Sequence, residues 1–146
     1  MFATAFYLVV DVAEGRAGYA TAGHPRPLHV RRERGTVEVL PAPPKPGPAL
    51  GLIPDAHYTT GEVGLAVADV LLLFTDGLFE VASPDGREDY GKSRLQAAAR
   101  DALNLPLPAL CQALIAGVRS FAGGADFGDD VCLLGVEVAP WAGRRL

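Results

Sequence analysis

The sequence lacks the features of a membrane protein and of a nucleic-acid-binding protein. No apolar run approaches the about 20 residues that a membrane-spanning helix needs. Basic residues are not in excess, because 13 lysines and arginines stand against 17 acidic residues, which gives a formal net charge of −4. A nucleic-acid partner would require a basic stripe that contacts phosphates. We therefore predict neither a nucleic-acid nor a membrane partner.

Cysteine is nearly absent, and no export signal is recognisable. Cys111 and Cys132 are far apart and form no CxxC motif, although two thiols in a secreted protein could pair. The apolar residues 1–10 have no basic segment before them and no small-residue cleavage site after them, so they favour a strand over a signal peptide. We therefore predict two reduced, buried thiols in a cytoplasmic protein.

Several catalytic motifs are missing as well. The chain contains no GxSxG, P-loop, HExxH or paired CxxC motif, so nucleophilic-serine and zinc chemistry have no support. Acidic residues are concentrated instead, since residues 55–89 contain eight acids and Arg87 is the single Lys or Arg there. This segment is either a solvated acidic face or, in part, a site for a hard cation.

Apolar patterning in the first half predicts strands. The continuous apolar run from Phe2 to Val10 predicts a strand that is covered on both faces, and residues 17–22 complete a hairpin with it. Alternation over residues 28–32 and 36–40 predicts a second hairpin. The five prolines of residues 41–48 predict an extended surface loop, with a polyproline ligand as the alternative.

The second half mixes strands and helices. The predicted elements are an edge strand at 58–63, a central strand at 70–74, helices around 95–103 and 110–121, a last strand at 131–138 and a loose tail at 140–146. Hairpin connections predict antiparallel sheets with helices packed on one side, which is an α+β fold class.

Asp76 is the first candidate for a metal ligand. It follows the most apolar stretch, residues 70–74, and precedes Gly77. A carboxylate at a strand end can point out of the sheet, and a glycine beside it allows a sharp turn. Oxygen donors of this kind suit Mg²⁺ or Mn²⁺. The alternative is an aspartate that caps a turn by accepting a hydrogen bond from its own backbone.

Asp129 and Asp130 form a second candidate, just before the last predicted strand. Adjacent carboxylates repel each other, which favours a nearby cation or a solvent outlet, although Asp-rich turns without a ligand are also common. Successive residues on a strand face opposite ways, so we expect one of the two to face the same site as Asp76.

His24 lies between Gly23 and Pro25 and could act as a general acid or a metal ligand. It has no His, Cys or Glu partners at metal-binding spacing. We therefore expect a loop histidine that packs or hydrogen-bonds to backbone.

Taken together, these landmarks resemble the SpoIIE-type branch of the metal-dependent protein phosphatases, the PPM family. The resemblance extends over about residues 1–138, and the motifs occur in the family's order. Residues 72–80 give the strongest match, to a threonine-aspartate-glycine motif. The other matches are a strand at 1–7, an alanine-glycine-histidine-proline signature at 20–28, a glycine-leucine loop at 49–52 and an aspartate pair at 129–134.

The resemblance implies a partial αββα sandwich and a bacterial, cytoplasmic hydrolase in signal transduction. In the family, two Mn²⁺ or Mg²⁺ ions bridge a water, lower its pKa and direct it at a phosphoserine or phosphothreonine, without a phosphoenzyme. The implied metal ligands are Asp76 and Asp129. Asp130 would lie beside them, Gly77 would let the backbone pass close, and His24 would support the site structurally. No side chain of this chain is assigned an acid–base or nucleophilic role.

The family's first half has no counterpart in this sequence. Its early aspartate and its aspartate-x-serine-glycine-histidine-glycine motif are absent, and Cys132 replaces the usual threonine after the aspartate pair. Two carboxylates alone should bind a divalent ion weakly. We therefore assign residues 1–139 to the C-terminal part of a phosphatase domain and expect little or no activity from the isolated chain.

Two interpretations follow. In the first, the chain is a piece of an active phosphatase, Met1 is internal to it, and the substrate is a phosphoprotein of the anti-sigma-antagonist type. In the second, it is a phosphatase-like remnant that binds such a partner without catalysis. A missing half would leave an apolar face exposed, so we also expect a homodimer through an exposed sheet face.

Overall fold

The computed structural model describes residues 1–140, which form two compact units. Residues 1–26 and 40–68 make up the first unit, together with residues 138–140. The second unit comprises residues 27–39 and 69–137. The predicted tail lies outside the described residues from position 141 onward.

Each unit contains one antiparallel sheet. The first unit has β1 (Ala5–Asp11), β2 (Arg16–Ala22) and β5 (Gly61–Gly64). The second has β3 (Leu28–Arg31), β4 (Thr36–Val39), β6 (Val70–Phe74), η1 (Asp76–Leu78), α1 (Gly91–Asp101), α2 (Leu107–Phe121) and β7 (Leu133–Glu137). Both predicted hairpins are present, and residues 41–48 contain no strand.

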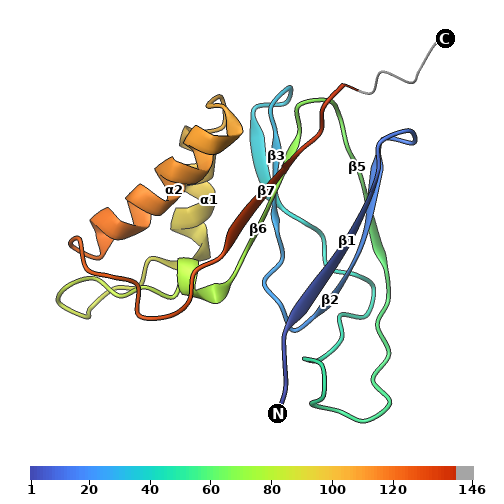
Figure 1. Ribbon diagram of the computed structural model, residues 1–146, viewed down its shortest axis with the longest axis horizontal. Helices are drawn as coiled ribbons and strands as arrows, with labels where there is room; N and C mark the ends of the chain where they lie inside the picture. The colour runs from blue at the N-terminus through green and yellow to red at the C-terminus, as the bar shows by residue number, and fades with distance from the viewer. Residues whose placement is uncertain (141–146) are drawn as a thin grey trace. The chain divides into compact units, whose positions relative to one another are not determined.

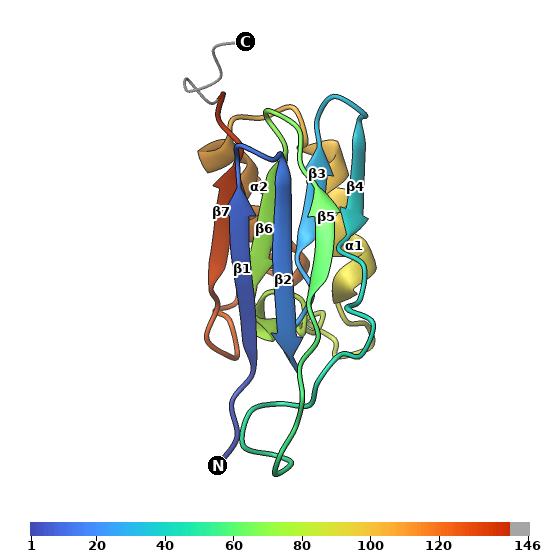
Figure 2. The ribbon, with the colours of Figure 1, turned by 90° about the vertical axis from the view of Figure 1, so that its right-hand side faces the viewer.

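The first unit is a three-stranded sheet in the order β1-β2-β5, with β2 in the middle (Figure 2). β1 and β2 pair from Ala5 opposite Ala22 to Asp11 opposite Arg16. Tyr19 of β2 is buried, with its ring stacked 5.7 Å from that of Phe6 and its hydroxyl donating to the Pro41 carbonyl at 2.9 Å. β5 is an outer strand, as predicted for this segment.

The prediction that the first strand is covered on both faces is wrong. The strand begins at Ala5, and Tyr7 and Val9 are 69% and 51% exposed, whereas Phe6 and Leu8 are half-buried. Side chains alternate between the two faces of a strand, so one face of β1 is solvated. An uninterrupted apolar run places apolar side chains on both faces of the strand, but it does not show that both faces are buried.

The second unit is a four-stranded sheet, β4-β3-β6-β7, with both helices on one side (Figure 1). Its core combines sheet residues such as Leu72 and Phe74 with Leu95 of α1 and Leu114 of α2. The helical apolar spacing therefore marks the buried faces correctly. Pro108 lies in the first turn of α2, where its missing N–H costs nothing.

The α+β fold class is confirmed, and the central position of β6 matches the prediction. No helix within residues 1–140 combines the length and apolar character needed to cross a membrane.

The prediction of two buried thiols is wrong, because Cys132 is exposed and Cys111 is half-buried. Both are free thiols, and burial raises the pKa of Cys111. Cys132 lies before β7, where no core covers it.

Candidate metal-binding site

The ends of β6 and β7 bring the two aspartate segments together. These neighbouring strands are antiparallel, with Phe74 opposite Leu133. The ladder continues one residue further, where the Thr75 N–H donates to the Cys132 carbonyl at 3.1 Å. Consequently, the chain leaving β6 and the chain entering β7 lie side by side at one end of the sheet.

Thr75 joins the two segments through its side chain. Its hydroxyl donates to the Asp130 carbonyl at 3.1 Å and accepts from the Cys132 N–H at 2.9 Å. A single side chain thus fixes the backbone on both sides of Val131. Sequence reasoning assigned no role to Thr75, and its place directly before Asp76 is the signal that could have suggested one.

Gly77 is the point of closest approach. A Cβ atom at this position would lie 2.6 Å from the Asp130 carbonyl oxygen and 3.4 Å from the Asp129 Cβ. Contacts as short as 2.6 Å do not occur for a real Cβ, so the two segments approach this closely because residue 77 has no side chain.

Asp76 and Asp129 are both exposed, and each accepts one local hydrogen bond. Asp76 Oδ1 accepts from the Gly77 N–H at 3.0 Å, and Asp129 Oδ1 accepts from the Asp130 N–H at 2.7 Å. For Asp76 the bond goes to the residue directly after it, and η1 has no side-chain hydrogen bond at its N-cap, so the turn-capping alternative stays a prediction. A carboxylate accepts through two oxygens, so these bonds account for one oxygen of each side chain.

The strand-alternation argument does not apply to Asp129 and Asp130. β7 begins at Leu133, so both aspartates lie in the irregular segment before it. What the structure does show is that Gly77 contacts the backbone of Asp130 and approaches the side chain of Asp129.

The donor set suits a hard divalent cation but is small. Carboxylate oxygens are the ligands that Mg²⁺ and Mn²⁺ prefer. Within residues 1–140, no group of three or more His, Cys, Asp or Glu side chains could hold an ion. Asp76 and Asp129 therefore fit part of a metal's ligand shell, and further ligands would have to come from elsewhere.

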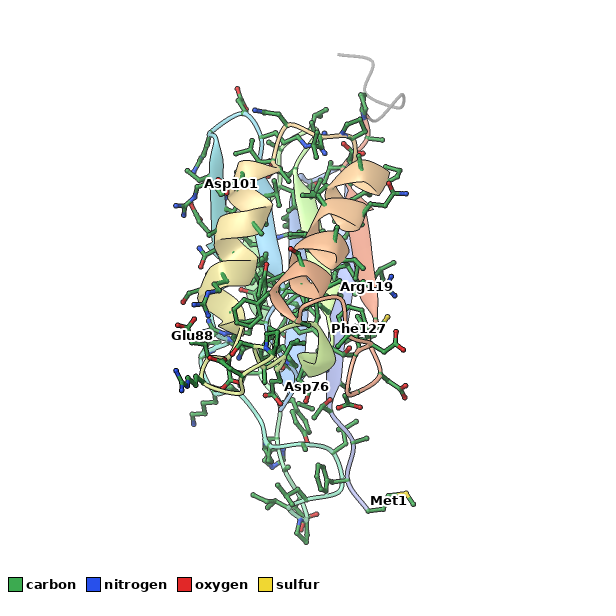
Figure 3. The ribbon with its side chains drawn as sticks, turned by 90° about the vertical axis from the view of Figure 1, so that its left-hand side faces the viewer. Met1, Asp76, Glu88, Asp101, Arg119 and Phe127 are labelled. Carbon is green, nitrogen blue, oxygen red and sulfur yellow. The ribbon has the colours of Figure 1, made fainter. Side chains whose placement is uncertain are left out.

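The surroundings of Asp76 include an open cavity. In Figure 3, Asp76 and Asp101 lie at opposite ends of the second unit, and Asp101 is the last residue of α1. Nearby, a cavity of about 590 Å³ is lined by Phe79, Glu80, Asp89, Gly91 and Lys92. The Glu80 N–H donates to the Asp76 carbonyl at 2.8 Å, which ties the cavity wall to η1.

His24 belongs to the first unit. Its Nδ1 lies 3.1 Å from Thr4 Oγ1, and its carbonyl accepts from Thr21 Oγ1 at 3.1 Å. The ring thus hydrogen-bonds to a side chain, whereas packing or a hydrogen bond to backbone had been expected. Its place near the metal ligands stays a prediction, because Asp76 and Asp129 belong to the second unit.

A family comparison accounts for nearly all of the chain. The model of "Stage II sporulation protein E (SpoIIE)" matches residues 1–139. This chain belongs to the SpoIIE family. The resemblance to SpoIIE-type phosphatases is therefore confirmed, and the family comprises protein phosphatase domains of the PP2C, or PPM, type.

Curated relatives match part of the chain. Protein IcfG of Synechocystis sp. is 33% identical over 95 residues, which is 65% of this chain and 14% of that protein. Phosphoserine phosphatase RsbP of Bacillus subtilis is 33% identical over 79 residues, which is 54% of this chain and 19% of that protein. The matched region thus spans less than a fifth of either relative.

Solved structures agree on the fold. The RsbU and RsbW domains of Rv1364c from Mycobacterium tuberculosis match with a TM-score of 0.75 and 25% identity, covering 94% of this chain and 37% of that one. The SiaA-PP2C domain of Pseudomonas aeruginosa matches with a TM-score of 0.75 and 26% identity, covering 92% and 51%. The chain therefore corresponds to part of a SpoIIE-type domain.

Proposed function

We propose that this chain is the C-terminal part of a metal-dependent phosphatase domain that hydrolyses phosphoserine or phosphothreonine in partner-switching signalling. The observation that supports this most directly is the contact of Thr75 and Gly77 with the Asp129–Asp130 segment. It places two exposed aspartates of the family motifs at the same end of one sheet. The relative RsbP is named a phosphoserine phosphatase, which supports the same reaction class.

In this proposal Asp76 and Asp129 hold Mn²⁺ or Mg²⁺. When bound, such ions supply an activated water and neutralise charge on the phosphate. Thr75 and Gly77 set the spacing between the two ligand segments, and Asp130 lies beside the ligands. His24 keeps a structural role near the site.

The proposed substrate is a phosphoprotein of the anti-sigma-antagonist type. In this proposal the positive charge that attracts the phosphorylated side chain comes from Lys92, which lines the cavity beside η1 with its Nζ 4.9 Å from the centre of the Phe79 ring. We take the cytoplasm as the location, because free thiols at Cys111 and Cys132 suit a reducing compartment.

Metal binding tests the site directly. Isothermal titration of the chain with MnCl₂ should show weak binding that Asp76→Asn and Asp129→Asn each abolish. Asp126→Asn removes an exposed carboxylate of the same loop and should leave the titration unchanged. Binding that survives Asp76→Asn would contradict the assignment of the ligands.

Activity is a separate question, because two carboxylates are a small part of a two-metal shell. We expect the isolated chain to release little or no phosphate from 4-nitrophenyl phosphate in MnCl₂. Any Mn²⁺-stimulated release should disappear in Asp76→Asn. Release that persists in that variant would show hydrolysis without the proposed site.

A second candidate function is a non-catalytic, phosphatase-like partner-binding module. It is favoured by the small donor set within residues 1–140. It predicts that a purified anti-sigma-antagonist phosphoprotein is retained equally by the parent chain and by the Asp76→Asn, Asp129→Asn double variant. Loss of retention in the double variant would favour the phosphatase site over this alternative.

A further inference from the structure

Asp76 lies beyond the end of its strand, so the β6 ladder does not hold it in place. β6 ends at Phe74, and the side chain of Asp76 is exposed. Thr75 anchors the backbone on one side of Asp76 through its bonds to the segment before β7. The position of the Asp76 carboxylate therefore also depends on what anchors the backbone on the other side, in η1.

Two backbone hydrogen bonds provide that second anchor. The Asp76 carbonyl accepts from the Phe79 N–H at 2.9 Å and from the Glu80 N–H at 2.8 Å. The Phe79 carbonyl in turn accepts at 2.9 Å from the N–H of Gly91, the first residue of α1. Phe79 thus joins the turn that carries Asp76 to the start of a helix.

The Phe79 side chain is fixed from two sides. It is buried, and its ring meets the Phe74 ring edge to face, with the ring centres 6.0 Å apart and the planes at 86°. Lys92 Nζ lies over the Phe79 ring, 4.9 Å from its centre. Edge-to-face pairs and cation–π contacts both depend on the orientation of the ring. β6 and α1 therefore hold this residue by contacts that require an aromatic side chain.

We infer that Phe79 is a positioning residue for Asp76, because its clamped ring fixes the backbone that holds the metal-binding carboxylate. The role of Asp76 as a metal ligand rests on the proposed function. Residues that orient a metal ligand without touching the ion typically change metal affinity by about 10- to 100-fold when they are replaced. Phe79 acts through its backbone, so freeing the ring loosens these bonds without removing them. The loss of affinity should therefore lie near the lower end of that range.

Phe79 also belongs to the hydrophobic core, so positioning has to be separated from packing. Phe121 supplies the matched control. Its ring meets the Tyr90 ring edge to face at 5.4 Å, and Arg94 Cζ lies 4.8 Å from its centre. Replacing Phe121 removes the same two kinds of contact. However, Phe121 is the last residue of α2 and lies outside the turn that carries Asp76.

The first experiment measures Mn²⁺ binding by the paramagnetic broadening of the Gly77 amide signal in NMR spectra. In Phe79→Leu, halving this signal should require about ten times the MnCl₂ concentration that the parent requires. In Phe121→Leu, the parent concentration should suffice. Unfolding in urea reports the packing cost of each substitution, and far-UV circular dichroism confirms that each variant folds. Equal losses of Mn²⁺ affinity in the two variants, or no loss in Phe79→Leu, would overturn the inference.

A second experiment needs no metal. Hydrogen exchange of the Glu80 amide reports its bond to the Asp76 carbonyl, because a bonded amide exchanges when the structure around it opens. Phe79→Leu should make this exchange several-fold faster, and Phe121→Leu should leave it unchanged. The Thr75 amide, which donates to the segment before β7, is the internal reference. It should exchange at the parent rate in both variants, and an equal rise at Thr75 and Glu80 would indicate general loosening instead of positioning.

The two measurements separate this inference from the proposed function. A parent chain whose Gly77 signal is not broadened by Mn²⁺ would contradict the metal site, and the exchange comparison would still decide whether Phe79 holds Asp76. Unchanged exchange of Glu80 in Phe79→Leu would overturn the inference even if Mn²⁺ binds as proposed.

Discussion

At the scale of the residue, Gly77 controls how closely the two aspartate segments approach. Gly77→Ala would place a Cβ 2.6 Å from the Asp130 carbonyl oxygen, so one backbone segment must move. Overpacking against backbone typically destabilises by about 1 to 3 kcal/mol. We expect a loss of that size in the free energy of unfolding by urea and a measurable loss of Mn²⁺ affinity, because the separation of Asp76 from Asp129 would change.

Gly128→Ala is the matched control for this substitution. Gly128 precedes Asp129 in the same loop, and a Cβ there meets nothing within 4 Å. It should leave both the unfolding free energy and the Mn²⁺ titration nearly unchanged. Equal effects of the two substitutions would mean that loop flexibility, and not the close approach at Gly77, determines metal affinity.

The buried pair of His29 and Asp69 predicts how stability depends on pH. His29 Nε2 lies 2.7 Å from Asp69 Oδ2, and the histidine side chain is 1% exposed. Burial lowers the pKa of His29 below its usual value of 6.5 and outweighs the hydrogen bond to Asp69, which favours the charged ring. As pH falls below about 6.5, the unfolded chain binds a proton that the folded chain resists, so stability falls at up to about 1.4 kcal/mol per pH unit.

Urea unfolding over a pH series tests this dependence. His29→Gln removes the titrating group and should flatten the slope between the lowered folded pKa and about 6.5. His57→Gln, at an exposed histidine, should retain the parent slope. A parent curve that is flat through this window would show that His29 does not resist protonation in the folded chain.

Residue types were easier to predict than their partners. Asp76 and Asp129 stand out because acids beside glycine at the ends of apolar runs are visible in sequence. The Thr75 hydroxyl bonds and the His29–Asp69 pair are not visible, because they join positions separated by 40 or more residues. Such contacts depend on strand register, which no local pattern specifies.

At the scale of the element, Gly135 determines how α2 begins against β7. A Cβ at residue 135 would lie 2.4 Å from Leu107 Cδ1 and 3.1 Å from its Cγ. Gly135→Ala should destabilise the chain by about 1 kcal/mol, since the flexible Leu107 side chain absorbs part of the clash. The measurement is a double-mutant cycle in urea, in which Leu107→Ala should remove the additional cost of Gly135→Ala.

Gly64→Ala provides the comparison for that cycle, because it lies at a strand end where a Cβ meets nothing within 4 Å. An additive cycle would mean that contact with Leu107 is not the cause of the destabilisation by Gly135→Ala.

The helices show which structural features apolar periodicity can predict, because the helical spacing identified α1 and α2 and their buried faces. The exposed face of β1 was missed, because an all-apolar run carries no information about which face is solvated.

At the scale of the whole molecule, the apolar pattern predicted the α+β fold class and the resemblance predicted the family. The topology confirms the first, and the match of the family model confirms the second. Sequence could not supply the division of the described chain into two contact units, since it depends on which strands pair. The sequence did indicate that the set of metal-binding carboxylates is small, because only two acidic motifs of the family occur in it. With so few ligands, a divalent ion should stabilise the folded chain only weakly.

Mn²⁺ should stabilise the chain only at high concentration and only through Asp76 and Asp129. A ligand that binds the folded state at about ten times its Kd adds about 1.4 kcal/mol to the free energy of unfolding. We expect MnCl₂ to raise the melting temperature of the parent chain and of Asp126→Asn, but not that of Asp76→Asn or Asp129→Asn. Matched ionic strength in NaCl separates this from screening, which acts on all four chains alike. If Mn²⁺ stabilised Asp76→Asn as much as the parent, the ion would bind elsewhere, and the close approach at Gly77 would have only a structural purpose.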